Sequence, residues 1–224
     1  MENISPFLTK IREEIIQKRK EEMKNQFLQA SGEFETDLNN HLCSIFGTRY
    51  VKRFKEGEVV KKTQVDNLIE QAFDKGVGFI LSGDVGIGKT MALIYAYKKI
   101  IEFASKEDKE KHDGFKYRVS RYTPLIHYYF APELFSMLHQ GEKPVIRKFM
   151  ILDDLGREYA EPFALERFEC FIEDIYKNGA VRVILTTNLT LNQFKIREGW
   201  ARITDRLMEI CSFLEIKGSS RRHR

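Results

Sequence analysis

The sequence predicts an α/β protein in which helices flank a parallel sheet. From residue 60 onward, short apolar runs alternate with stretches whose apolar residues recur at helical spacing. One of these runs leads into a glycine-rich loop, and two others end in polar side chains. Alternating strands and helices are typical of parallel sheets, which bind ligands at the carboxyl ends of their strands.

The individual elements follow from apolar content and periodicity. Apolar, often β-branched runs predict strands at 78–81, 126–130, 149–152, 181–186 and 212–216. Helical periodicity predicts helices at 65–73, 90–104, 162–177 and 200–211, and one that begins at Pro132. The inner side of the helix at 162–177 is expected to carry Phe163, Phe168, Phe171, Ile172 and Ile175.

The region before residue 60 differs in composition. Residues 6–30 lack glycine, are rich in Glu, Lys and Arg, and carry apolar residues at helical spacing, which predicts an amphipathic helix. Such a helix either packs on its own domain or docks on a partner protein. Residues 31–58 are mixed and contain several glycines. We therefore place a boundary near residue 55, between a mainly helical, partner-binding region at 1–55 and an α/β domain at 56–224.

Composition restricts the class of protein. Of the 224 residues, 42% are hydrophobic and 31% are charged, so the chain can bury a sizeable core. The net charge is only +4, and the basic segment after residue 216 is either solvated or in contact with phosphate. Cys43, Cys170 and Cys211 lie far apart, without metal-ligand spacing. No apolar stretch approaches the roughly 20 residues of a membrane span, so we expect a cytoplasmic protein without membrane contact.

The glycine-rich loop carries the strongest signal. Residues 83–90 read GDVGIGKT and fill every fixed position of the pattern G-x-x-x-x-G-K-[ST], between a predicted strand and a predicted helix. Its glycines let backbone N–H groups point at phosphates, Lys89 would reach the β- and γ-phosphates of ATP, and Thr90 would bind Mg²⁺. The flanking elements disfavour a chance glycine turn. The predicted ATP contacts are Gly83, Asp84, Val85, Gly86, Ile87, Gly88, Lys89 and Thr90.

Two later strands end in candidate catalytic residues. Residues 149–156 read FMILDDLG, so a buried strand would deliver Asp153 and Asp154 to the ligand-binding edge of the sheet. Asp153 would hold the Mg²⁺ of the nucleotide, and Asp154 would orient or polarise the attacking water. The alternative for such a pair is a turn or a helix N-cap. After the strand VILTT, Asn188 would touch the γ-phosphate or its water, unless it only caps the next turn.

A longer segment resembles a known family. The run LDDLGREYAEPFALERFECFIEDIYKNGAVRVILTTNLTLNQF is similar to the central block of the DnaC/IstB-like AAA+ ATPases, P-loop NTPases that include bacterial helicase loaders. The resemblance covers about residues 55–222. It implies that residues 83–90 form the Walker A motif, that Asp153 and Asp154 form Walker B, and that Asn188 is sensor 1. It also implies that residues 56–224 form an AAA+ ATPase domain.

The resemblance extends to two groups of arginines. The segment WARITDRLMEI at 200–210 resembles the family's G-E-R-x-x-D-R-[LM] block, which implies that Arg206 acts on ATP held by a neighbouring subunit. Arg202 lies one helical turn earlier on the same face. Simple surface pairing with acidic residues of the same helix is the alternative role for both. Arg221 lies where a sensor 2 arginine is expected, and the adjacent Arg222 fits that role as well.

Three departures from the family pattern bear on function. Asp154 stands where many AAA+ ATPases have Glu, which is one methylene longer. Trp200 and Ala201 replace Gly-Glu before Arg202, and the N-terminal region lacks the cysteine cluster found in some loaders. No arginine close in sequence to the loop or to the Asp pair is expected to serve the γ-phosphate of its own chain. We therefore expect self-association through the ATP site and Arg206.

Several functions compete on these motifs. A helicase loader would hydrolyse ATP, bind single-stranded DNA, and use its N-terminal region to bind a replicative helicase. An IstB-type helper of a transposase would share the same ATPase core. A small-molecule kinase shares the phosphate loop, but the ordered series of Asp153, Asn188 and Arg206 disfavours it. A replication initiator would need a DNA-reading domain after the last strand, which is not expected here. The loader is the preferred interpretation.

Overall fold

A computed structural model describes residues 17–18, 21, 32–111, 119–156 and 161–218 of the chain. Its centre is one five-stranded sheet in which every neighbouring pair of strands is parallel. The order of the strands is β2-β3-β4-β1-β5. The strands are β1 (Gly78–Gly83), β2 (Ile126–Phe130), β3 (Phe149–Leu155), β4 (Arg182–Thr187) and β5 (Cys211–Ile216). The predicted α/β class with a parallel sheet is confirmed.

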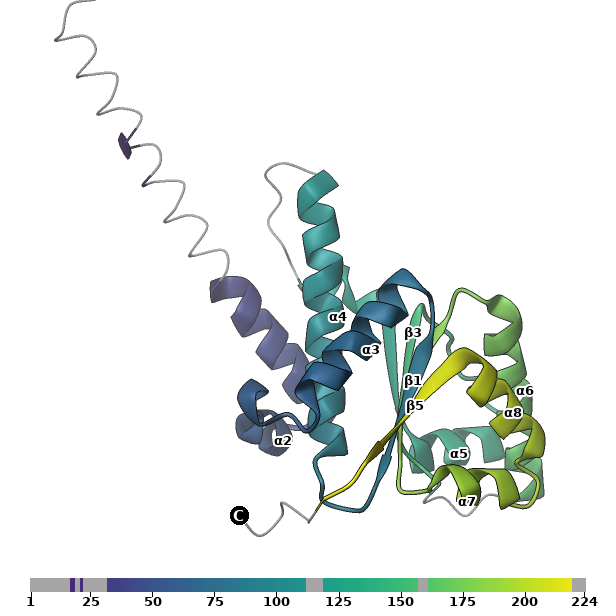
Figure 1. Ribbon diagram of the computed structural model, residues 1–224. Helices are drawn as coiled ribbons and strands as arrows, with labels where there is room; N and C mark the ends of the chain where they lie inside the picture. Colours follow the sequence, from purple (N-terminus) through teal and green to yellow (C-terminus); the bar gives the residue numbers. More distant parts are fainter. Residues whose placement is uncertain (1–16, 19–20, 22–31, 112–118, 157–160, 219–224) are drawn as a thin grey trace, which may run out of the picture.

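Helices cover both faces of this sheet (Figure 1). One face carries α3 (Lys62–Asp74), α4 (Lys89–Lys111) and the helical residues 32–46. The other carries α5 (Ala131–His139), α6 (Pro162–Asn178), α7 (Leu191–Ile196) and α8 (Ala201–Ile210). The short elements are α2 (Thr48–Arg53) and three 3-10 turns, η1 (Glu56–Glu58), η2 (Val119–Arg121) and η3 (Thr123–Leu125).

The central strand β1 shows why the sequence forms these layers. Its residues are almost all buried, as expected for a strand with helices on both sides. Because successive side chains of a strand point to opposite faces, Phe79 and Leu81 enter the core beneath α4. Ile80 between them enters the second core, beneath α6 and α8. Two hydrophobic cores therefore share one sheet.

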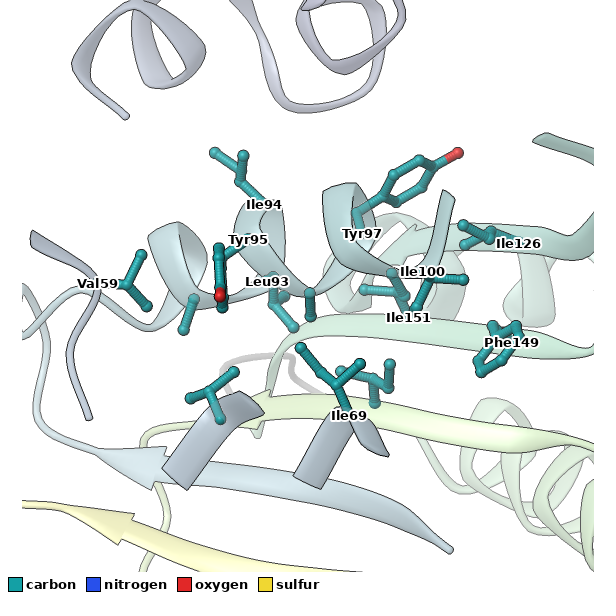
Figure 2. Close-up of a cluster of buried hydrophobic side chains, with 14 of the residues drawn as sticks. Val59, Ile69, Leu93, Ile94, Tyr95, Tyr97, Ile100, Ile126, Phe149 and Ile151 are labelled. Carbon is teal, nitrogen blue, oxygen red and sulfur yellow. The ribbon is translucent and has the colours of Figure 1, made fainter. Parts of the chain in front are cut away.

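Helix α4 is buried on more than one side. Figure 2 shows Leu93 and Ile100 pointing toward α3 and the strands, whereas Ile94 and Tyr97 point away from them. All four side chains are buried. The outward side is covered by residues 32–46, because the hydroxyl of Tyr97 lies 2.8 Å from Nε2 of His41 in that helix.

Residues 38–46 therefore share a core with the α/β unit. Leu38 and Leu42 are fully buried, and Phe46 is nearly so, in the same cluster as α3 and α4. The boundary at residue 55 stays a prediction, but a cut there would remove part of this core. The amphipathic helix predicted at 6–30 lies almost entirely outside the described residues, apart from the helical residues 17, 18 and 21.

The prediction that Phe163 belongs to the core is wrong. Phe163 lies at the start of α6 and is 49% exposed. Its ring packs under the guanidinium of Arg167, at 4.6 Å, instead of entering the core. The next residue, Ala164, is buried instead, four residues before Phe168. Phe163 lies five residues before Phe168, a spacing that places it on a different side of the helix. No helix within the described ranges is both long enough and apolar enough to cross a membrane.

Replacing Leu42 tests whether residues 32–46 belong to the folded core. Leu42→Ala should lower the free energy of unfolding by about 2–5 kcal/mol, because a buried leucine is replaced by a cavity. The exposed neighbour Asn39→Ala is the matched control and should change it by less than about 0.5 kcal/mol. Urea titration followed by circular dichroism measures both. Equal stabilities would mean that this helix does not contribute to the core.

Candidate nucleotide-binding site

The glycine-rich loop joins the carboxyl end of β1 to the first turn of α4. Gly83, Gly86 and Gly88 all have positive φ angles, of 152°, 86° and 104°. At Gly83 a Cβ atom would lie 2.4 Å from the carbonyl oxygen of Ile216 in β5. Only glycine can therefore occupy this position without displacing the neighbouring strand. The loop passes from the sheet into α4 as the sequence predicts.

Lys89 connects this loop to the residue that follows β4. Its side chain is buried, and Nζ donates hydrogen bonds to the backbone oxygens of Gly83 and Asp84, at 2.6 and 2.9 Å. It donates another to Oδ1 of Asn188, at 2.8 Å. Asn188 directly follows β4, so the structure brings together two residues that lie 99 positions apart in the sequence.

Asp153 is a buried carboxylate at the end of β3, only 4% exposed. Oδ1 accepts a hydrogen bond from the hydroxyl of Thr186, and Oδ2 accepts bonds from Tyr128, at 3.2 Å, and Thr90, at 3.4 Å. Burial raises the pKa of the Asp153 carboxyl, and the bond from Thr186 opposes that shift. A divalent cation fits this carboxylate, since its charge would offset the loss of solvation. Thr90 and Asp153 would hold it.

Asp154 is positioned by an irregular backbone. The register between β3 and β4 shifts between Leu152 and Leu155, and Asp154 within this bulge has a φ of 60°. Its backbone N–H donates to the hydroxyl of Thr186, at 2.8 Å. A left-handed conformation is strained for most residues but comparatively accessible to Asp. The bulge turns Asp154 into the same cavity as Lys89, while Asp153 stays buried beneath it.

These side chains line one cavity of about 990 Å³. The cavity is large enough for a cofactor-sized ligand. From the predicted site it contains Val85, Gly86, Gly88, Lys89, Thr90, Asp153, Asp154 and Asn188. The same cavity is also lined by a basic segment around α2, namely Arg49, Lys52, Arg53 and Lys55.

Two arginines of the same chain, Arg49 and Arg53, line the cavity that contains this loop, although neither is close to it in sequence. They reach the cavity because residues 32–46 pack on α4 and α2 follows directly after them. Spacing along the sequence gave no signal for this placement, and the expectation that the γ-phosphate is served by an arginine of a neighbouring copy stays a prediction.

No family model matches the chain, and no curated protein matches it in sequence. Solved structures do resemble it. The DnaC helicase loader aligns with a TM-score of 0.50 at 20% identity, over 70% of this chain and 88% of that one. DnaI aligns with a TM-score of 0.51 at 18% identity, over 70% and 85%. Domain III of the replication initiation protein DnaA from Thermotoga maritima aligns with a TM-score of 0.53 at 12% identity, over 73% and 67%.

The chain has the AAA+ fold of these proteins. Within that fold, the glycine-rich loop, the pair Asp153–Asp154 and Asn188 lie at the carboxyl ends of β1, β3 and β4 and meet at one edge of the sheet. This arrangement agrees with the rule that open α/β sheets bind ligands outside the carboxyl ends of their strands.

Arg202 and Arg206 lie elsewhere, on the face that α8 shares with α6. Arg206 Nε donates to Oε2 of Glu173 at 3.0 Å, and its guanidinium stacks 4.3 Å from the ring of Tyr176. Arg202 pairs with Glu169 at 3.1 Å. Neither arginine lines the nucleotide cavity of its own chain. Arg221, the predicted sensor 2 residue, lies outside the described residues.

Sequence reasoning missed two residues of this site, Thr186 and Tyr128. The Thr186 hydroxyl donates to the carboxylate of Asp153 and accepts from the backbone N–H of Asp154, so it orients one carboxylate and holds the backbone that carries the other. Tyr128 reaches Asp153 from β2, and burial raises the pKa of its phenol, so it stays a hydrogen-bond donor. For Thr186 the sequence did offer a signal, because this residue lies in the strand that leads to Asn188.

Removing the buried cation tests the nucleotide assignment. Lys89→Ala should weaken binding of a fluorescent ATP analogue about ten- to a hundredfold, because a hydrogen bond from a charged group contributes about 1.5–3 kcal/mol. The exposed Lys143→Ala is the control and should bind as the wild type does. Thermal unfolding must show that Lys89→Ala is folded. Equal affinity in a folded variant would contradict the assignment.

Proposed function

We propose that the chain binds Mg²⁺ and ATP in this cavity and hydrolyses the nucleotide. The observation that carries the proposal is the convergence of a buried lysine, a buried aspartate and a second, partly exposed aspartate at one sheet edge. Lys89 would pair with the β- and γ-phosphates. Thr90 and Asp153 would hold Mg²⁺, which neutralises charge on the phosphates when bound.

Asp154 and Asn188 would act on the attacking water. Asp154 faces the cavity, so its carboxylate is available to accept a hydrogen bond from water near the γ-phosphate. Asn188 is fixed through its bond with Lys89, which orients its amide toward the same region. One side chain that binds phosphate and another that orients water are thereby mechanically linked.

We further propose that the active ATPase is an assembly of several copies. Arg206 is outside the cavity of its own chain, but a head-to-tail contact would bring it to the γ-phosphate held by the next copy. An arginine that stabilises the transition state in this way contributes roughly 10³ to 10⁵ in rate. Such a contact repeats into a ring or a spiral, which suits a protein that tracks single-stranded DNA.

Mixing two inactive variants tests the trans role of Arg206. Arg206→Ala has an intact cavity without the arginine, and Lys89→Ala has the arginine without an intact cavity. The mixture should regain ATPase activity that neither shows alone, measured as phosphate release with single-stranded DNA present. Arg202→Ala mixed with Lys89→Ala is the matched comparison. No recovery with Arg206→Ala, while this variant still binds ATP, would contradict its assignment.

We propose that the assembly loads a replicative helicase onto DNA. The support is the AAA+ fold shared with the DnaC helicase loader, together with the family motifs in the same order along the chain. The basic, amphipathic composition of residues 6–30 suits a segment that docks on a partner protein. Since residues 38–46 belong to the core, the partner-binding part is best separated before residue 32.

A truncation tests this division. Removal of residues 1–31 should abolish capture of a purified replicative helicase of the source organism, while the Kd for ATP stays within about twofold of wild type, since the core is retained. Interaction is measured by size-exclusion chromatography with light scattering. Unchanged capture by the truncated chain would contradict the role of this region. Capture of a transposase instead of the helicase by the full chain would favour the IstB-type function.

A further inference from the structure

The basic residues of α2 form one face of a short helix. Arg49, Lys52 and Arg53 are spaced three and four residues apart, so they lie on the same side. All three are exposed, and all three line the cavity that contains the phosphate loop. The sequence of α2, TRYVKR, contains no acidic residue that could neutralise them.

This helix is held close to the Walker B side of the cavity. Gly47, with a φ of 83°, turns the chain from the helical residues 32–46 into α2. Immediately before it, the ring of Phe46 packs edge-on against Tyr128, with the ring centres 4.7 Å apart. Tyr128 in turn donates to Asp153. One end of the basic segment is thus anchored beside the carboxylate that would hold Mg²⁺.

The other end of the segment is anchored beside the loop. After α2 and η1, the chain buries Val59 and Val60, and Val60 lies 3.8 Å from where a Cβ of Gly88 would be. The segment between Phe46 and Val60 therefore crosses the opening of the cavity, from Walker B to Walker A. Figure 1 shows α2 beside the lower end of α4, where the phosphate loop begins that helix.

The charges around the cavity favour an anion. Its lining contains the cations Arg49, Lys52, Arg53, Lys55 and Lys89 and the acids Glu58, Asp153 and Asp154. Lys55 is paired with Glu58, at 3.2 Å. Among the described residues, no hydrogen bond or ion pair engages the side chains of Arg49, Lys52 or Arg53. Like charges on one helix face repel one another, and a bound polyanion would relieve that repulsion.

We propose that Arg49, Lys52 and Arg53 form a cationic lid that binds the triphosphate of the ATP held in the same chain. The inference rests on the proposed ATP site and adds a second set of phosphate contacts, opposite Lys89. It distinguishes two kinds of arginine in this protein. Those of α2 act within their own chain and favour ATP over ADP, whereas Arg206 acts on the next copy.

Nucleotide affinity tests the lid directly. The variant Arg49→Ala/Arg53→Ala should bind a fluorescent ATP analogue about tenfold or more weakly, because charged hydrogen bonds to phosphate are lost. Its affinity for the matching ADP analogue should fall by a smaller factor. Arg49→Lys/Arg53→Lys, which keeps both charges, should recover most of the affinity for ATP. Lys75→Ala, at the exposed end of α3 and outside the cavity, is the control and should behave as wild type.

The outcomes separate the lid from the ATP site itself. If the wild type binds no ATP, the proposed function fails and the lid with it. If the wild type binds ATP and the double alanine variant binds it equally well, only the lid is overturned. Loss of affinity for single-stranded DNA with an unchanged Kd for ATP would also overturn it, because α2 would then contact nucleic acid.

A mixing experiment tests whether the contact is made within one chain. Excess Lys89→Ala protein carries an intact α2 but a damaged phosphate loop. When it is added to the double alanine variant, the weakened affinity for the ATP analogue should stay unchanged, because a lid from another copy cannot substitute. Restored affinity would mean that α2 of one copy reaches the site of the next, and would overturn the assignment to the same chain.

Discussion

The buried carboxylate of Asp153 constrains the whole site. An ionised group that is removed from water needs polar partners nearby. Here they come from three separate elements, as the hydroxyls of Thr90 in α4, Tyr128 in β2 and Thr186 in β4. They can converge on one carboxylate only if the strands keep their parallel register and the glycine loop delivers the first turn of α4 to the same edge. The packing that forms the fold therefore also forms the site.

The two adjacent aspartates have been given different environments. Asp153 is enclosed and fully engaged by hydroxyls, while the bulge in β3 turns Asp154 toward the cavity. Thr186 bonds to the carboxylate of Asp153 and to the backbone N–H of Asp154, so its single hydroxyl ties the buried carboxylate to the bulge. The roles proposed for them, cation binding by Asp153 and action on water by Asp154, require such a division. Lys89 and Asn188 add a second fixed pair across the cavity.

Residues 32–53 connect this site to the N-terminal region. They pack on the outer side of α4 through Leu38 and Leu42, and they reach Tyr128 through Phe46. A change at the nucleotide therefore has a contiguous packed route toward the segment for which we propose partner binding. Both the basic face of α2 and this route depend on how the helical residues 32–46 pack on α4.

Local signals in the sequence determined the α/β class and the core of the site. The glycine pattern around Lys89 and the polar ends of two apolar runs, at Asp153 and Asn188, are readable because strand ends of a parallel sheet meet at one edge. Only the tertiary structure decided that Thr186 bonds to the carboxylate of Asp153 and the backbone of Asp154, and that Arg49 lines the same cavity. A single hydroxyl or a surface arginine carries no periodic signal, and its contacts depend on how distant helices pack against the sheet.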